Sequence, residues 1–101
     1  MLVEFVEPAL IELDDAMEYY EVQSAGLSIK FFGEVLETID LIVQFPHAWP
    51  QNSEHTRRAI LRDFPYNLIY SILIDKIYII AVAHQNRMPE YWIDRLSQML
   101  P

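Results

Sequence analysis

The spacing of apolar residues changes once along the chain, near residue 50, and that change restricts the folds open to it. Before residue 50 the apolar positions recur every three or four residues over 9–22 and again over 27–44, which is the period of an amphipathic helix. After it they run in strand-sized stretches over 56–64, 66–74 and 77–84. Helices followed by strands in separate parts of the chain predict the α+β class.

Proline and glycine mark where these segments begin and end. Pro8 suits the first turn of the first helix, where its missing N–H costs nothing, and Pro46 ends the second helix. Gly26 is predicted to adopt a left-handed conformation between the two helices. Pro89 is predicted to open a short last helix that runs to about residue 99. A strand is predicted over residues 2–6, because apolar residues alternate with glutamates there.

These segments give the order β-α-α-β-β-β-(α), with two N-terminal helices packed on one face of a small, mainly antiparallel sheet. The strand over 77–84 is predicted to be central, because its apolar run is too continuous for an exposed edge. The strand over 2–6 is most simply placed at an edge, and Asp75-Lys76 is predicted to connect the last two strands tightly. The length suits one domain, so residues 1–101 are predicted to form a single domain.

Composition excludes several kinds of site. No cysteine is present, which excludes a disulfide scaffold, a thiolate zinc site, a cysteine nucleophile and an iron–sulfur cluster. Two glycines are too few for a loop that cradles phosphate. His47, His55 and His84 lack metal-ligand spacing, so neither a metal nor a cofactor is expected. The sequence has no basic signal-peptide start and no apolar span of about 18 residues, so a cytoplasmic protein without a membrane partner is expected.

Charge is distributed unevenly along the chain. The whole sequence has 15 acidic and 7 basic residues, for a formal net charge of −8. Residues 1–50 hold ten acids and one base, Lys30, whereas residues 51–101 hold five acids and six bases. The net charge argues against charge-driven attraction to nucleic acid or to an anionic membrane. The second half is locally basic, and a functional site is expected there.

The acidic residues of the two helical segments are interpreted as solvated faces. They are Glu12, Asp15 and Glu18 in the first helix and Glu34, Glu37 and Asp40 in the second. The alternative is that this acidic surface binds a basic or amphipathic partner. Helical spacing gives no indication of the converging carboxylates that glycosidase-type catalysis needs.

Three arginines lie on or near the strand predicted over residues 56–64. Arg58 and Arg62 are four residues apart and are predicted to share one face of that strand, with Arg57 on the other. His84 ends the last strand, and Arg87 follows it. If these strands are neighbours, the groups converge at one end of the sheet face opposite the helices.

A cluster of arginines with a histidine suits phosphate binding and charge stabilisation in phosphodiester cleavage. Either His84 or Tyr91 would then transfer the proton. The candidate catalytic residues are Arg58, Arg62, His84, Arg87 and Tyr91. The alternative is that the arginines belong to the solvated face of a half-exposed sheet.

Several short motifs of aromatic and basic residues are spread along nearly the whole chain. They are Tyr19-Tyr20-Glu21, Phe31-Phe32, Phe45-Pro46, Phe64-Pro65-Tyr66 followed by Tyr70, and Val82-x-His84-x-x-Arg87-x-Pro89. In combination, these motifs resemble the RelE/ParE superfamily of type II toxin–antitoxin toxins. The resemblance implies two N-terminal helices on a small antiparallel sheet, in agreement with the order read from periodicity.

The resemblance also implies a toxin that a small cognate antitoxin wraps and neutralises. RelE-like members cleave messenger RNA on the ribosome, whereas ParE-like members inhibit DNA gyrase and are not nucleases. The His84-x-x-Arg87 ending and the shortage of lysine are more similar to the ParE-like, plasmid-stabilisation branch. Growth inhibition through DNA gyrase is therefore the leading hypothesis. A RelE-like ribosome-dependent mRNA endonuclease and a non-toxic interaction module are the alternatives, and both enzymatic activity and a homodimer are left open.

Overall fold

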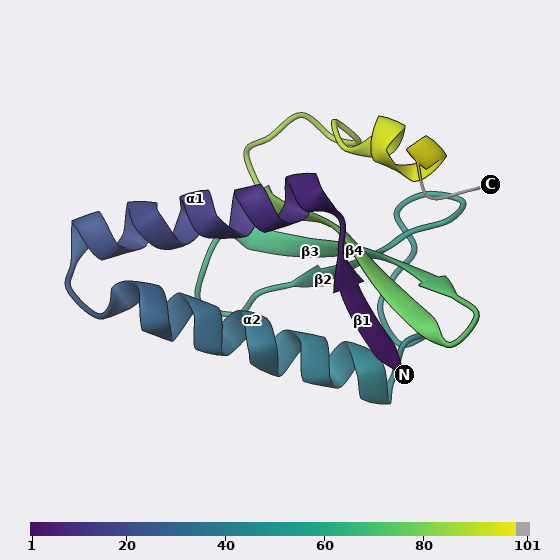
Figure 1. The fold of residues 1–101 in the computed structure, drawn as a ribbon, viewed down its shortest axis with the longest axis horizontal. Helices are drawn as coiled ribbons and strands as arrows, with labels where there is room; N and C mark the ends of the chain where they lie inside the picture. The colour runs from purple at the N-terminus through teal and green to yellow at the C-terminus, as the bar shows by residue number, and fades with distance from the viewer. Residues whose placement is uncertain (99–101) are drawn as a thin grey trace.

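A helical hairpin lies beside a four-stranded sheet in the computed structural model of the chain, which describes residues 1–98 (Figure 1). The elements in chain order are β1 (Leu2–Phe5), α1 (Glu7–Gln23), α2 (Leu27–Gln44), β2 (Arg57–Ile60), β3 (Tyr66–Leu73), β4 (Lys76–His84) and a 3-10 helix, η1 (Ile93–Gln98). The predicted α+β class and the order of helices and strands are confirmed. Within the described residues, no helix combines the length and apolar character needed to cross a membrane.

The sheet has the strand order β1-β4-β3-β2. β1 runs parallel to β4, and the other two pairings are antiparallel. The predicted central position of β4 and edge position of β1 are both confirmed. The pairing of β3 with β4 shifts at one point, where Ile69 pairs with Ala81 but Tyr70 pairs with Ile79. Ile80 is therefore an extra residue on β4, and this bulge lets Ile80 and Ala81 both join the apolar cluster on one face.

Each face of the sheet carries its own apolar cluster. The cluster that faces the helices includes Ala9, Leu13, Phe31, Val35 and Ile42 from the hairpin and Leu68, Tyr70, Ile77, Ile79 and Val82 from the strands. The second cluster consists of Ile69, Ile80, Ala81, Ala83 and Trp92. Neighbouring residues along a strand point to opposite faces, so these two sets of strand residues lie on opposite sides of the sheet.

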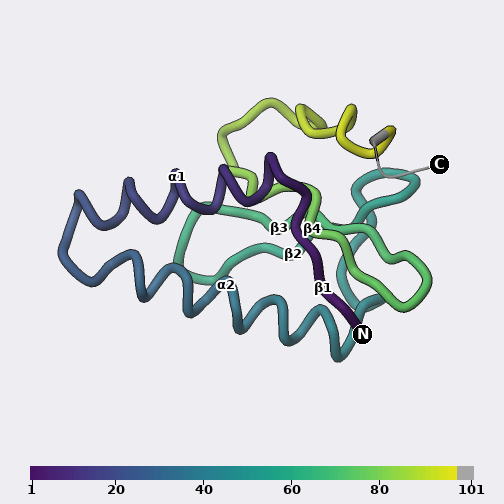
Figure 2. Tube along the Cα trace, in the orientation of Figure 1, coloured from purple at the N-terminus to yellow at the C-terminus, as the bar shows by residue number. Residues whose placement is uncertain are grey.

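The C-terminal segment covers part of the second face. Figure 2 shows the chain leaving β4, turning back and passing beside the N-terminal half of α1. Trp92, from this segment, is only 3% exposed and packs with Ile69 and Ile80. The part of the sheet around Trp92 is therefore a second core rather than a solvated surface.

The first strand of the β-rich half is shorter than predicted. The sequence predicted a strand over 56–64, but β2 ends at Ile60. Beyond it, the Leu61 N–H donates to the Tyr66 carbonyl at 3.0 Å, and the Asp63 N–H donates to the Glu34 carboxylate at 2.9 Å. A side chain of α2 therefore takes the backbone donor that a longer strand would have used.

The connection between β3 and β4 differs by one residue from the prediction. Leu73 pairs with Lys76, so the two-residue loop is Ile74-Asp75 rather than Asp75-Lys76. Asp75 has a positive φ of 58°. Aspartate tolerates this left-handed conformation better than most residues, which explains why a loop without glycine can form here.

The helix predicted from Pro89 is also wrong at its start. Glu90 has a positive φ of 61°, which is incompatible with a right-handed helix beginning at Pro89. The chain instead turns through Tyr91 and Trp92 and forms the 3-10 helix η1 from Ile93. The predicted end, Met99, lies outside the described residues.

The turn between the two helices is held by a carboxylate. Gly26 has φ 88°, so the predicted left-handed conformation is confirmed. Gly26 precedes α2 without a capping side chain of its own. The Glu21 carboxylate, from the last turns of α1, accepts hydrogen bonds from the Gly26 N–H at 3.1 Å, the Ser28 N–H at 3.3 Å and the Ser28 hydroxyl at 2.7 Å. These hydrogen bonds lower the pKa of Glu21, and the bond from the Ser28 hydroxyl has the largest effect.

We expect Glu21→Gln to lower the melting temperature at neutral pH, because the ionised cap of α2 is lost. A lowered pKa in the folded chain means that the stabilisation is present above about pH 4.3 and disappears as the pH falls through that lowered pKa. Thermal unfolding at a series of pH values, with the exposed Glu18→Gln as control, measures this. An equal difference between Glu21→Gln and the parent chain at neutral and strongly acidic pH would rule out the ionised carboxylate as the cause.

Candidate functional site

A hollow of about 300 Å³ lies where β4 ends. Its walls include four of the five residues singled out from the sequence: Arg58, His84, Arg87 and Tyr91. They come from β2, from the end of β4 and from the segment that follows it. The antiparallel pairing of β2 and β4 with β3 brings these distant parts of the sequence to the same end of the sheet.

His84 is held in one orientation. Its partner in the β3–β4 register is Tyr66, and the two rings meet edge to face with centroids 5.0 Å apart. Its Nδ1 accepts a hydrogen bond from the Asn86 N–H at 3.0 Å. In the neutral imidazole, Nδ1 is therefore the acceptor, and Nε2 carries the proton. His84 consequently presents an N–H donor beside the hollow.

His84 is also the common wall of two neighbouring hollows, of about 370 and 230 Å³. Tyr19 and Tyr66 line both of these hollows, and Asp15 and Arg87 line the smaller one. The end of β4 is therefore a continuous uneven surface with basic, aromatic and acidic parts. Such a surface can make several kinds of contact with a partner at once.

Arg87 stacks on an aromatic ring. Its guanidinium carbon lies 3.9 Å from the centre of the Tyr91 ring, a cation–π contact. Stacking uses the flat face of the guanidinium and leaves its N–H groups pointing outward in the plane. Arg87 also lines the hollow, where a guanidinium can donate hydrogen bonds to an anionic group.

The Tyr91 hydroxyl is committed to a carboxylate. It donates to Glu12 Oε2 at 2.5 Å. Burial, followed by the hydrogen bond and the negative charge of Glu12, raises the pKa of Tyr91 far above its ordinary value. Tyr91 therefore stays a neutral phenol whose proton is already shared, which makes it a poor proton-transfer group for a ligand.

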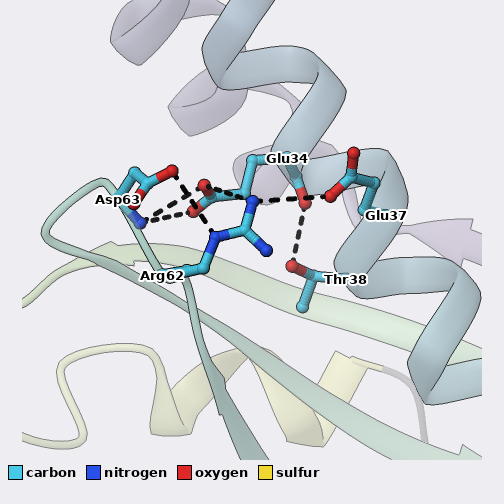
Figure 3. A network of polar contacts seen from close by, with 5 residues as sticks. All are labelled: Glu34, Glu37, Thr38, Arg62 and Asp63. Atoms are coloured by element: carbon cyan, nitrogen blue, oxygen red, sulfur yellow. Dashed lines mark hydrogen bonds and ion pairs between the residues drawn. The ribbon is translucent and has the colours of Figure 1, made fainter.

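Arg62, the fifth candidate, is not among the residues that line the hollow and lies instead beside acids of α2 (Figure 3). The prediction that Arg58 and Arg62 share a strand face is wrong, because β2 ends before Arg62. The Arg62 side chain is 71% exposed, with Nη2 3.7 Å from a carboxylate oxygen of Glu34 and 3.7 Å from one of Glu37, and Nε 3.5 Å from Asp63. Its charge is balanced by three acids. Exposed ion pairs at such distances contribute little stability.

Arg57 has a structural role at the other end of β2. Its Nη1 donates to the carbonyls of His47 at 3.1 Å and Trp49 at 2.6 Å. Nearby, the Tyr70 hydroxyl donates to the Pro46 carbonyl at 2.6 Å, and burial raises the Tyr70 pKa to about 12. Another hollow, of about 210 Å³, lies here. These polar groups fix the loop that follows α2.

Of the acids predicted to lie on solvated faces, Glu34 is buried and Glu12 is partly buried. Glu34 is 7% exposed and accepts hydrogen bonds from the Asp63 N–H, while its own carbonyl accepts from the Thr38 hydroxyl at 2.8 Å (Figure 3). The Glu12 side chain is 15% exposed and pairs with Arg95. A signal for Glu12 was present in the sequence. It falls on the same helical row as Ala9 and Ala16, and both of these small residues are buried against the sheet.

Asp15, Glu18, Glu37 and Asp40 are exposed as predicted. Across residues 1–98, the structure places no three His, Cys, Asp or Glu side chains in a group suited to binding a metal ion. The chemistry available at the end of β4 is therefore that of guanidinium, imidazole, phenol and carboxylate groups.

The comparisons with known proteins agree with this architecture. The fold is similar to that of a chain of the chromosomal ParDE TA system from P. aeruginosa, with a TM-score of 0.73 over 83% of this chain and 95% of that one, at 17% identity. No curated protein sequence matches this one. A family model described as the ParE toxin of the type II toxin–antitoxin system, parDE, matches residues 3–89. The chain therefore belongs to the ParE toxin family, within the RelE/ParE superfamily.

Proposed function

We propose that this chain is a growth-inhibiting toxin that acts on DNA gyrase and that a cognate antitoxin neutralises it. Membership of the ParE toxin family supports the toxin role and the antitoxin partner. The observation that favours a protein target over RNA cleavage is the commitment of the Tyr91 hydroxyl to Glu12. Of the two residues predicted to transfer a proton, only His84 then remains available. Phosphodiester cleavage uses both a general acid and a general base.

The charges around the hollow also favour a protein target. Asp15 lines the hollow of about 230 Å³, and Glu90 lines the hollow of about 300 Å³. His84 and Arg87 line both of these hollows. Together with the net charge of −8, these carboxylates weaken attraction for a polyphosphate strand. An acidic side chain of a protein is small enough to meet Arg58 and Arg87, and arginine binds carboxylates through paired N–H donors. We propose that the hollow contacts such side chains of the target.

The test is a supercoiling assay with purified gyrase and the purified chain. We expect the chain to inhibit supercoiling or to increase cleaved DNA complexes. Arg87→Ala should weaken this inhibition by about thirtyfold, the effect of removing an arginine at the centre of a contact. The matched control is Arg62→Ala, an arginine whose charge is balanced within the chain, and we expect it to stay within about twofold of the parent.

Two further arms separate the alternatives. A ribosome-dependent nuclease would cut messenger RNA only when ribosomes are added, with gyrase unaffected. A non-toxic interaction module would leave growth unchanged when the soluble chain accumulates in cells. Either result would contradict the gyrase proposal, as would equal effects of Arg87→Ala and Arg62→Ala. Co-expression of the cognate antitoxin should restore growth.

A further inference from the structure

The carboxylate of Glu12, in the acidic helix α1, lies at the centre of a cluster that reaches the candidate site. Its Oε1 accepts hydrogen bonds from the Val82 N–H at 3.0 Å and from Arg95 Nη1 at 2.8 Å. Its Oε2 accepts from the Tyr91 hydroxyl at 2.5 Å and from Arg95 Nη2 at 3.1 Å. One helical carboxylate thus joins α1, the central strand β4 and the C-terminal segment.

The partners of Glu12 in the C-terminal segment lie beyond residue 89, where the match to the ParE toxin family ends. Arg95 binds Glu12 through two nitrogens and also donates to the Ile80 carbonyl at 2.9 Å. Its side chain is 18% exposed, and Trp92 beside it is buried in the second apolar cluster. The segment is therefore fixed to the sheet by both packing and a paired charge.

The ring of Tyr91 connects this cluster to the hollow. The guanidinium carbon of Arg95 lies 5.3 Å from the ring centre, and that of Arg87 lies 3.9 Å from it. The hydroxyl is held by Glu12 at the same time. A ring fixed at its hydroxyl cannot easily turn away, so the platform under Arg87 stays in place.

We propose that Glu12 and Tyr91 are positioning residues that fix the Arg87 guanidinium at the edge of the hollow, so that the acidic helix builds part of the toxin's contact site. This rests on the proposed role of Arg87 in target binding. Packing of the C-terminal segment alone would not require Arg87 to be ordered. Positioning predicts that the order of Arg87 and the activity of the toxin change together.

The structural arm of the test is NMR of the full chain. The Arg87 δ-protons should show an upfield ring-current shift in the parent chain and a reduced one in Tyr91→Phe, which keeps the ring but loses the hydrogen bond to Glu12. The shift should disappear in Tyr91→Leu. Tyr78→Leu is the matched control, because it removes a tyrosine of β4 that also makes a cation–π contact, with Lys76 4.9 Å from its ring centre. An Arg87 shift that is absent from the parent chain, or that survives Tyr91→Leu, overturns the proposal.

The functional arm measures growth inhibition by equal amounts of soluble toxin. Tyr91→Leu should weaken inhibition by about tenfold, the range of a partly desolvated cation–π contact. Tyr78→Leu should leave inhibition unchanged, and Tyr91→Phe should inhibit less than the parent chain but more than Tyr91→Leu. The double variant Arg87→Ala/Tyr91→Leu should inhibit growth as strongly as Arg87→Ala alone, because Tyr91 acts only through Arg87 and the two effects therefore do not add.

The outcomes separate the positioning proposal from the proposed function. If Arg87→Ala keeps full activity, the site assignment in the proposed function is wrong. If Arg87→Ala abolishes activity and Tyr91→Leu does not, or if the two effects simply add, positioning by Tyr91 is wrong while the function stands. Glu12→Gln provides the last check: it should broaden or reduce the Arg87 ring-current shift, and an unchanged shift would exclude Glu12 from the positioning role.

Discussion

Replacing Glu12 with alanine is expected to lower the free energy of unfolding by about 2–3 kcal/mol, the effect of removing an ionised hydrogen-bond acceptor from a partly buried cluster. The change would leave the Arg95 guanidinium, whose side chain is 18% exposed, without its carboxylate. It would also remove the acceptor of the Val82 N–H and of the Tyr91 hydroxyl. Glu12 also lines the hollow of about 230 Å³, so water can reach some of these donors, but no water replaces the ionised partner of Arg95.

The measurement is equilibrium urea unfolding, with Glu18→Ala as the matched control. Glu18 is an exposed acid in the same helix, so its removal should change stability by no more than about 0.5 kcal/mol. Comparable effects of Glu12→Ala and Glu18→Ala would show that the cluster around Glu12 does not hold the fold together. If Glu12→Ala does not fold, the smaller change Glu12→Gln should still unfold at lower urea than Glu18→Gln.

The parts of the fold that the sequence predicted are those set by local pattern. The hairpin follows from helical spacing on both sides of Gly26, and the α2 boundaries match the predicted 27–44. The central place of β4 follows from its continuous apolar run, since a strand covered on both faces has no polar side. These features depend on residues close together in the chain, where periodicity carries information.

The parts that were predicted wrongly depend on contacts between distant residues. β2 is short because a carboxylate of α2 takes the Asp63 N–H, a pair separated by 29 positions. Glu12 meets Arg95 across 83 positions. Both acids lie at helical positions that were predicted to be solvated, because a buried or partly buried carboxylate with a distant partner leaves the same local pattern as an exposed one. Only the neighbouring alanines, Ala9 and Ala16, hinted that this side of α1 approaches the sheet.

The same long-range contacts change the meaning of the uneven charge. The two chain halves, with charges of −9 and +1, are not electrostatically separate layers. Glu12 and Glu34 belong to the acidic half but bind groups of the other half. Glu12 accepts a hydrogen bond from Arg95, and Glu34 accepts one from the Asp63 N–H. Of the arginines in the second half, Arg57, Arg62 and Arg95 are used inside the chain, whereas Arg58 and Arg87 line the hollow. The basic site is therefore small, which is consistent with a contact to a few acidic side chains.

The largest packing effect is expected at Trp92, the large side chain of the C-terminal segment that is buried, among the residues described. Trp92→Ala should lower the free energy of unfolding by about 3–5 kcal/mol, the usual result of emptying a buried aromatic site. The adjacent Ile93, 40% exposed, gives the control: Ile93→Ala removes an apolar side chain from the same segment and should cost less than about 1 kcal/mol. Both are measured by urea unfolding. Trp92 lies beyond the residues that match the family. Equal and small effects of the two changes would show that the sheet is stable without this segment. The second apolar cluster would then contribute little to the stability of the fold.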